Sequence, residues 1–199
     1  MAYIGVSMKY LNKVLAKKLP KLKLHDSDLG NIGLVLVNGK KVTFEEFSKM
    51  ENLKVKGSLD LNGTALEKLP SGLTVGGDLW LSGSKIKELP SGLTVGGFLD
   101  LRRTAIKELP SGLTVGGNLY LNRTAITELP SGLKVGGNLD LGKTAITELP
   151  SGLTVGGDLD LYITAIKELP EDLKVKGKIF ISKGMEKTFN AGKFKSKVH

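Results

Sequence analysis

The apolar residues of this chain recur every twenty positions between Leu53 and Asp172. Six copies of one unit begin at Leu53, Leu73, Leu93, Leu113, Leu133 and Leu153. Six positions are apolar in every copy, and in the second copy they are Leu73, Val75, Leu79, Leu81, Ile86 and Leu89. A unit this short cannot bury its own apolar face, so the copies are expected to stack into a solenoid with one continuous core.

The spacing inside the unit predicts strands and corners. Leu79 and Leu81 lie two positions apart, as in a strand with one buried face, and Leu73 to Val75 predicts a second, shorter strand. We expect Gly76-Gly77 to adopt the backbone angles of a sharp corner, and the Leu-Pro-Ser-Gly segment to form another. Twenty residues leave no room for a full helix as well. The predicted fold class is mainly β: a right-handed solenoid of parallel strands, with six coils and a partial seventh.

The two ends of the chain depart from the repeat and are predicted to cap the solenoid. Residues 1–52 are expected to form a small α+β cap. Its expected elements are an amphipathic helix over Met8–Lys18, a hairpin of Leu34–Val37 with Lys40–Phe44, and a short helix that begins with a capping box of Thr43 and Glu46.

The solenoid itself is expected to span residues 53–182. Its seventh coil begins at Leu173 and keeps the pattern as far as Ser182. Residues 183–199 are rich in lysine, and Phe189 and Phe194 are available there to cover the last coil. We therefore expect a basic cap and tail at this end.

A motif of the repeat resembles a known family. The motif Leu79-x-Leu81-x-x-Ser84-x-Ile86-x-x-Leu89-Pro90 recurs as Leu119-x-Leu121-x-x-Thr124-x-Ile126-x-x-Leu129-Pro130. It resembles the leucine-rich repeat, and within that family the short twenty-residue bacterial class with its Leu-Pro pair, over about 120 of the 199 residues. The resemblance implies recognition of another protein through the strand face rather than catalysis.

The unit differs from that family in two ways. The Asn that the family places after the strand is replaced by a hydroxyl residue, namely Thr64, Ser84, Thr104, Thr124, Thr144 and Thr164. We expect these hydroxyls to hydrogen-bond backbone groups of their own or the adjacent coil. The alternative is an exposed hydroxyl row that binds ice or a repeating carbohydrate. The Leu-x-Val-Gly-Gly segment also adds residues before the strand, which leaves the curvature open between a horseshoe and a straighter prism.

Charge is distributed unevenly along the chain. The net charge is +9, with 29 Lys and Arg against 20 Asp and Glu. Nine lysines and five acidic residues in 1–52 give +4, twelve basic and fourteen acidic residues in 53–172 give −2, and eight lysines with one Glu in 173–199 give +7. A solenoid that binds nucleic acid would carry its positive charge along a face of the repeats. We expect the basic ends to be solubilising caps, with nucleic-acid binding through Lys193, Lys195 and Lys197 as the alternative.

Residues that carry chemistry are scarce. Cys is absent, and the only histidines, His25 and His199, lie in different caps. This excludes a disulfide framework and argues against a catalytic triad or a metal site, so we expect no enzyme and no cofactor. The Gly-Gly pairs lack the lysine and spacing of a phosphate loop. We find no signal peptide and no stretch of about 20 apolar residues, so a cytoplasmic location without membrane insertion is expected.

Aspartates form a column one residue beyond the strand leucine: Asp60, Asp100, Asp140 and Asp160. Asp140 and Asp160 would lie about 4.8 Å apart, close enough to repel each other or to share a cation. Calcium binding is one interpretation, although the nine-residue period of calcium-binding β-rolls is missing. Neutralisation by nearby basic residues such as Arg102 and Arg123 is the simpler one.

Variation inside a copied unit singles out one face. Aromatic residues and arginine, which are enriched where proteins bind proteins, occur on or just after the same strand. The predicted binding residues are Trp80, Phe98, Asp100, Arg102, Arg103, Tyr120, Arg123, Lys143 and Tyr162. We predict a non-enzymatic module that binds another protein, as a monomer or weak oligomer, for instance an effector or a phage-encoded inhibitor of a host protein. The alternatives are a nucleic-acid-associated protein that uses the basic termini, and a self-assembling structural rod.

Overall fold

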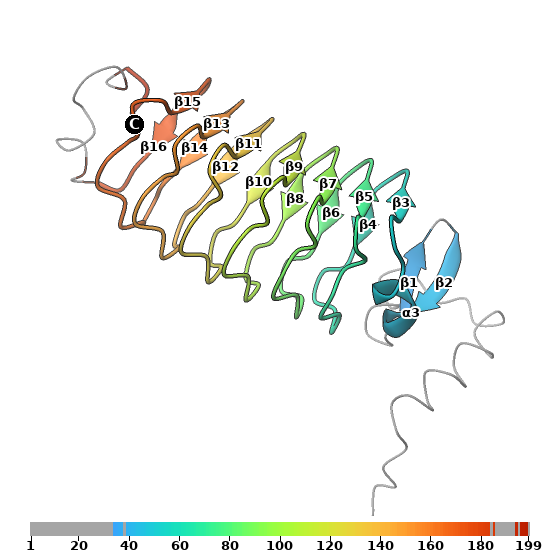
Figure 1. Ribbon diagram of the computed structural model, residues 1–199. Helices are drawn as coiled ribbons and strands as arrows, with labels where there is room; N and C mark the ends of the chain where they lie inside the picture. Colours follow the sequence, from blue (N-terminus) through green and yellow to red (C-terminus); the bar gives the residue numbers. More distant parts are fainter. Residues whose placement is uncertain (1–33, 38, 184, 186–193, 195, 199) are drawn as a thin grey trace, which may run out of the picture.

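The computed structural model of this protein describes residues 34–37, 39–183, 185, 194 and 196–198. These residues form two long parallel sheets along a stack of coils, with almost no helix (Figure 1). The coils follow one another along a nearly straight axis, so the described stack is a prism rather than a horseshoe. The helix predicted over Met8–Lys18, the side chain of Phe189 and the lysines at 193 and 195 lie outside the described residues.

Each coil contributes two strands of two residues, and we number the coils 1 to 7 from Leu53 in steps of twenty residues. The first sheet contains β3 (Lys54–Val55), β5 (Thr74–Val75), β7 (Thr94–Val95), β9 (Thr114–Val115), β11 (Lys134–Val135), β13 (Thr154–Val155) and β15 (Lys174–Val175). The second contains β4 (Leu59–Asp60), β6 (Leu79–Trp80), β8 (Leu99–Asp100), β10 (Leu119–Tyr120), β12 (Leu139–Asp140), β14 (Leu159–Asp160) and β16 (Ile179–Phe180). Both predicted strands and the seventh coil are confirmed.

The coils are in strict register because residues twenty positions apart pair with each other. Leu119 of β10 faces Leu99 of β8 on one side and Leu139 of β12 on the other. In the second sheet the N–H of Leu119 donates to the carbonyl oxygen of Asn138 in coil 5 at 2.8 Å. In the first sheet the N–H of Gly116 donates to the carbonyl oxygen of Val95 in coil 3 at 2.9 Å. Each internal coil is therefore hydrogen-bonded to both neighbours.

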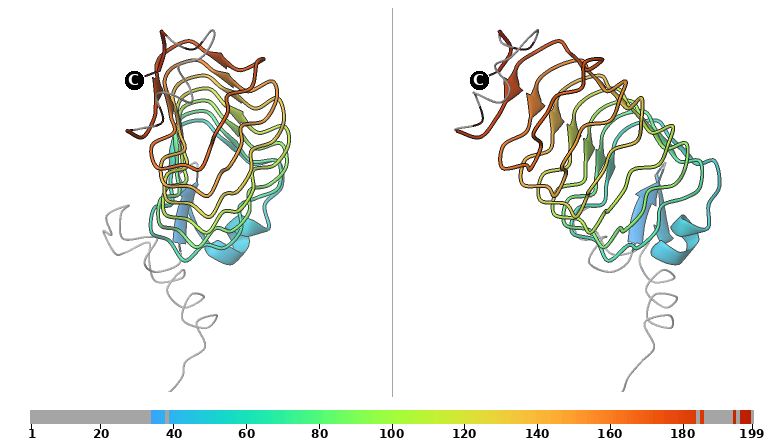
Figure 2. Two further views of the ribbon diagram at one scale, coloured as in Figure 1. Left: turned by 90° about the vertical axis from the view of Figure 1, so that its left-hand side faces the viewer. Right: turned by 60° about the vertical axis from the view of Figure 1, so that its left-hand side comes forward.

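The core fills the inside of the coils, as the apolar pattern predicts. Of the six apolar positions in each of the six copies, only Leu53 and Leu169 are not fully buried, and they belong to the first and last copies. Viewed close to the axis, the coils superimpose as a flattened loop (Figure 2). Equivalent side chains consequently stack in rows, and each internal coil buries its apolar face against two others.

The glycine corner corrects one prediction. None of the glycines at the Gly-Gly corners has a φ between +20° and +160°, so these positions do not require unusual backbone angles. Glycine is needed there because adjacent coils approach closely. A Cβ on Gly96, Gly116 or Gly136 would lie nearer than 3.0 Å to the carbonyl oxygen of the equivalent glycine in the coil before it. At the second glycine of the pair, a Cβ on Gly117 would lie 2.8 Å from the carbonyl carbon of Gly97, whereas on Gly57 of coil 1, where no coil precedes, it would meet nothing within 4 Å. Glycine is therefore favoured at the internal corners by the approach of two backbones, whereas the first and last coils carry Lys56 and Lys176 at the first position of the pair.

The hydroxyl column is confirmed as structural. The Thr104 hydroxyl is buried and donates to the carbonyl of Leu101 in its own coil at 2.7 Å, and the other four threonines do the same at 2.7 to 2.9 Å. Ser84 is the exception, because its buried hydroxyl has no partner. An exposed ice- or carbohydrate-binding row is excluded, because five of the six hydroxyl residues are buried and Thr164 is half-buried.

A second polar column, which we did not predict, links one coil to the next. A side-chain oxygen accepts a hydrogen bond of 2.7 to 2.9 Å from a backbone N–H twenty residues later, and the acceptors are Ser58, Asp78, Asn118, Asn138 and Asp158. Phe98 interrupts the column because its ring cannot accept. The signal in the sequence is a Ser, Asp or Asn directly before the strand leucine in most copies.

Both ends show capping elements where the structure describes them. At the N-terminal end β1 (Leu34–Val37) and β2 (Lys40–Thr43) pair antiparallel, and α3 (Phe44–Ser48) begins with the predicted capping box. Phe47 of α3 is fully buried. At the other end Phe194 is buried in the core, and the N–H of Ile179 in β16 donates to Lys197 at 2.7 Å. The predicted hairpin, short helix and Phe194 cover are confirmed.

Candidate functional site

The outer face of the β4–β16 sheet carries the side chains that differ most between copies. One residue of each strand points outward, and register places them in a column: Asp60, Trp80, Asp100, Tyr120, Asp140, Asp160 and Phe180. The rest of each strand is a buried leucine or isoleucine that hardly varies. The column is therefore where the solenoid presents coil-specific chemistry.

Three aromatic rings cluster over coils 2 to 4. The Trp80 and Phe98 ring centroids lie 5.1 Å apart at 86°, and those of Phe98 and Tyr120 lie 6.0 Å apart at 70°. Both are edge-to-face arrangements, which are favourable beyond the area they bury. All three rings are half-buried, and Asn118 donates to the Tyr120 hydroxyl at 2.7 Å. We call these three rings the aromatic cluster; each ring packs against its neighbour and restricts its movement.

Asp100 lies between Trp80 and Tyr120 in the register, and its burial corrects an expectation. It is only 2% exposed, whereas its place among the predicted binding residues implied an accessible carboxylate. Arg102 holds it through two bonds: Nη2 donates to Oδ2 at 2.6 Å and Nε to Oδ1 at 2.9 Å. The guanidinium also lies 5.4 Å from the Tyr120 ring centroid. Arg102 therefore neutralises Asp100 inside its own coil, and this bond raises the pKa of Arg102 above its ordinary value.

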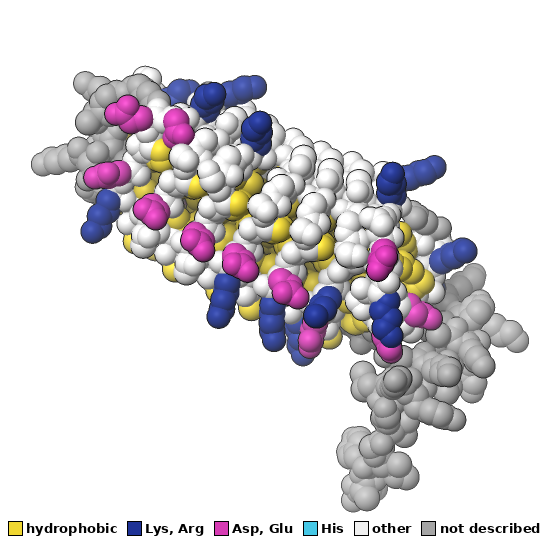
Figure 3. Space-filling view, in the orientation of Figure 1, with side chains coloured by type: hydrophobic (Ala, Val, Ile, Leu, Met, Phe, Trp, Pro, Cys, Tyr) yellow, Lys and Arg dark blue, Asp and Glu magenta, His cyan; other side chains and the backbone are white. Residues whose placement is uncertain are grey.

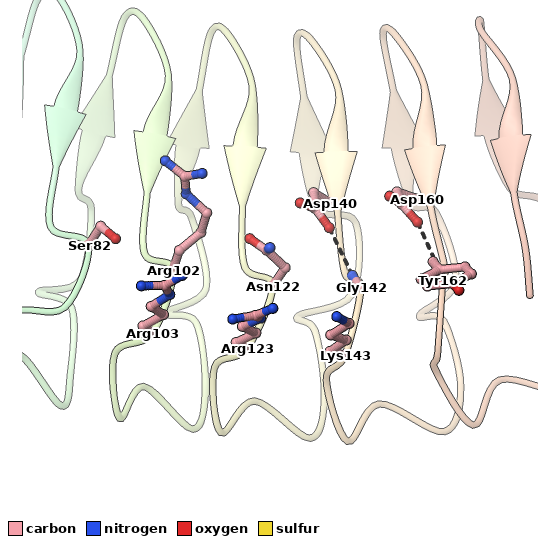
Figure 4. Close-up of a pocket in the computed structure, with 10 residues that line it drawn as sticks. All are labelled: Ser82, Arg102, Arg103, Asn122, Arg123, Asp140, Gly142, Lys143, Asp160 and Tyr162. Atoms are coloured by element: carbon pink, nitrogen blue, oxygen red, sulfur yellow. Dashed lines mark hydrogen bonds between the residues drawn. The ribbon is translucent and has the colours of Figure 1, made fainter.

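A groove of about 420 Å³ lies beside this cluster on coils 3 to 6, and Ser82 of coil 2 lies at its margin beyond Arg102 (Figure 4). Its lining residues are Ser82, Arg102, Arg103, Asn122, Arg123, Asp140, Gly142, Lys143, Asp160 and Tyr162. The groove exists because Gly142 has no side chain at a position where coil 3 carries Arg102 and coil 6 carries Tyr162. These two larger residues form its ends, and Asn122 lies between Arg102 and Gly142.

The two long edges of the groove carry opposite charges. Asp140 and Asp160 lie on the strand side, whereas Arg103, Arg123 and Lys143 follow one another on the far side (Figure 4). The carboxylates each accept one backbone N–H of their own coil, from Gly142 at 2.9 Å and from Tyr162 at 2.8 Å. Among the described residues, none of these five charged side chains forms an ion pair. The predicted neutralisation of the aspartates by Arg123 is thus not made as a direct contact.

The acidic edge is electrostatically unfavourable for its own charges. Partial burial raises the pKa of Asp140, and the neighbouring charges of Asp160 and Asp100 raise it further, while the Gly142 N–H and the Arg102 charge act in the opposite direction. Nearby, the buried amide oxygen of Asn122 accepts no hydrogen bond. The equivalent oxygen of Asn62 accepts the N–H of Ser82, but Gly142 donates its N–H to Asp140 instead. This edge therefore has acceptors in excess of donors.

Replacing Asp140 with Asn is expected to stabilise the protein at neutral pH and to have little effect in acid. A raised pKa in the folded state means that the folded chain binds this proton more tightly than the unfolded chain does, so stability falls as pH rises above the unfolded value of about 3.9. Asn removes that loss and keeps an oxygen for the Gly142 N–H. Urea denaturation midpoints of Asp140→Asn and the wild type at neutral pH and below that value measure the effect. An equal difference at both pH values would contradict it.

The structure separates the predicted binding residues into two neighbouring groups. The first group is the aromatic cluster of Trp80, Phe98 and Tyr120, together with the buried Asp100. Arg102 joins this group to the second, which lines the groove and consists of Arg103, Arg123, Lys143 and Tyr162. Sequence reasoning missed the groove residues Ser82, Asn122 and Gly142, and it considered Asp140 and Asp160 only as a possible cation pair and not as part of the binding face. The available signal was Gly142, a residue without a side chain in a column that otherwise carries one.

No family model, curated protein or solved structure matches this chain. Within the part of the chain that the structure describes, no group of three or more His, Asp or Glu side chains is arranged to hold a metal ion. No helix in that part has the length and apolar character needed to cross a bilayer.

Proposed function

We propose that this protein is a non-enzymatic recognition module, a solenoid of the leucine-rich type, that binds another protein through the outer face of the β4–β16 sheet. Aromatic and arginine side chains are the types that dominate binding energy at protein interfaces. Here they are concentrated over coils 2 to 6 and are attached to a hydrogen-bonded sheet. A preformed surface of this kind loses little conformational freedom on binding.

The observation that carries the proposal is the backbone conformation under the basic edge. Arg103, Arg123 and Lys143 have φ values of 58°, 61° and 59°, in the left-handed region, and Ile163 of coil 6 has 57°, whereas coils 1 and 2 have Gly63 and Gly83 at this position. A left-handed non-glycine residue costs about 1 to 2 kcal/mol. Glycine at this position would therefore make the solenoid more stable. Coils 3 to 6 thus keep a side chain here in spite of its backbone cost, and in three of these four coils the side chain is an exposed cation of the basic edge. Side chains held at such a cost are a feature of functional sites.

The charge pattern favours a protein over a nucleic acid as the partner. Asp140 and Asp160 lie directly across the groove from the basic edge and would repel a phosphate backbone. On the flank in view in Figure 3, acidic side chains form a line along the stack with basic side chains beside it. The described surface therefore offers mixed charge, which suits the mixed charge of a protein surface.

Capture of the partner tests the proposal. The immobilised wild type, an Arg103→Ala/Arg123→Ala variant and a Lys134→Ala control are exposed to extract of the native host, and bound proteins are identified by mass spectrometry. Lys134 is exposed on β11 in the other sheet. A protein captured by the wild type and the control, and bound at least about tenfold more weakly by the double variant, is the expected result. Equal capture by all three forms would overturn the assignment of this face.

A further inference from the structure

We infer that the groove on coils 3 to 6 binds an extended segment of the partner in which basic and acidic side chains alternate. The inference rests on the proposed function and specifies which part of a partner the face recognises. Three properties of the groove carry it: its length, the opposite charges of its edges, and its unpaired polar groups.

The length of the groove suits a short piece of extended chain. Its ends, Arg102 and Tyr162, belong to coils 3 and 6, which are three steps apart. Steps of about 4.8 Å between paired strands give about 14 Å, which is the length of about four residues of extended chain. Arg102 is an end wall rather than a free cation, because Asp100 already binds its guanidinium. Tyr162 is 50% exposed and offers its ring at the other end.

The two edges select alternating charge. Successive side chains of an extended chain point to opposite sides, so every second residue faces the same edge. Lysine or arginine side chains on one side of the segment would meet Asp140 and Asp160, and acidic side chains on the other would meet Arg103, Arg123 and Lys143. A segment with one sign of charge would place half of its side chains against like charge.

The groups on both edges are available for such a partner. In the described residues these two carboxylates and three cations make no ion pair with one another or with other side chains. A cationic side chain beside Asp140 would also offset the partial burial and the repulsion by Asp160, both of which raise the pKa of Asp140. Binding thus supplies the counter-charges that the free protein lacks.

Two synthetic peptides of identical composition test the inference. Both are acetylated and amidated hexapeptides of three lysines and three glutamates; in one the two residues alternate, and in the other they form two blocks. Titrations followed by NMR are expected to give at least about tenfold tighter binding of the alternating peptide, with shifts at the amides of Asn122, Gly142 and Tyr162. Equal affinities, or shifts confined to other surfaces, would overturn the inference.

Gly142→Arg is the blocking variant. It places in coil 5 the arrangement that coil 3 already has, where Arg102 binds Asp100 two residues before it. The new side chain is expected to pair with Asp140, occupy the groove and abolish binding of the alternating peptide. Thr114→Arg on the exposed strand β9 adds the same charge to the other sheet and should leave binding unchanged. Undiminished binding by a folded Gly142→Arg variant would overturn the site.

Neutralising the acidic edge separates this ligand from a nucleic acid. In an Asp140→Asn/Asp160→Asn variant the alternating peptide should bind more weakly, because two of its counter-charges are lost. A single-stranded oligonucleotide that binds the wild type at this groove, and binds the variant more tightly, would overturn the inference. If neither hexapeptide binds while partner capture still depends on Arg103 and Arg123, an alternating-charge segment is rejected as the ligand of the groove. The proposal that this face binds a protein then stands.

Discussion

Replacing Gly117 with alanine is expected to lower the free energy of unfolding by about 3 kcal/mol, because two backbones would be forced apart. A Cβ at Gly117 would lie 2.8 Å from the carbonyl carbon of Gly97, 2.9 Å from its oxygen and 3.0 Å from the nitrogen of Phe98. All three atoms are backbone, so no rotamer change can make room. The N–H of Gly117 also donates to the Gly97 carbonyl at 2.8 Å, and separation of coils 3 and 4 would lengthen that bond. Urea denaturation followed by circular dichroism measures the loss.

Gly57→Ala is the matched control for this prediction. It occupies the same position of the unit in coil 1, where an added Cβ would meet nothing within 4 Å. We expect a change within about 0.5 kcal/mol, as for an ordinary surface substitution. Similar losses for the two variants would mean that the corner requires glycine for its backbone angles, and would reject close approach as the reason.

Replacing Arg102 with alanine is expected to cost about 2 kcal/mol, the second largest effect. The change leaves the Asp100 carboxylate, whose side chain is 3% exposed, without its two guanidinium hydrogen bonds. Breaking a fully buried pair costs about 3 to 5 kcal/mol, and we expect less here because the Arg102 side chain is 48% exposed and screened by water. Loss of the contact with the Tyr120 ring adds to the effect.

A second substitution distinguishes loss of charge compensation from loss of packing. In the double variant Asp100→Asn/Arg102→Ala no unpaired charge remains, and more than half of the lost stability should return. Arg123→Ala, which removes an arginine that forms no ion pair in the described structure, should leave stability unchanged within about 0.5 kcal/mol. A double variant as unstable as Arg102→Ala alone would show that packing of the guanidinium, rather than its charge, is what Asp100 and Tyr120 require.

The solenoid could be predicted because its determinants repeat within a single coil. The two-residue spacing of Leu79 and Leu81, and its return every twenty positions, places strand, core and register together. The same logic identified the threonine hydroxyls and the seventh coil. In each case the partner of a residue is either in its own unit or in an identical unit, so one copy represents all of them.

The candidate site could be predicted only in part, because it depends on differences between neighbouring coils. Asp100 has the same place in its unit as Asp140, yet the large side chains Trp80 and Tyr120 flank it and Arg102 closes over it. The groove likewise results from the missing side chain of Gly142 between Asn122 and Tyr162. Reading along one unit cannot show such contacts. Reading down a column of equivalent positions would have indicated both.

The glycine corner also bears on how this protein can change in length. Two glycine backbones meet at each internal corner, and Gly96 and Gly136 meet equivalent carbonyls. All internal units therefore contact their neighbours through the same surface. Loss or duplication of twenty residues would leave both caps and the leucine rows joined as before. It would shift the aromatic cluster and the charged edges relative to each other by about 4.8 Å. Variants of this chain with whole units gained or lost would thus keep the fold and present the remaining binding side chains at a different spacing along the stack.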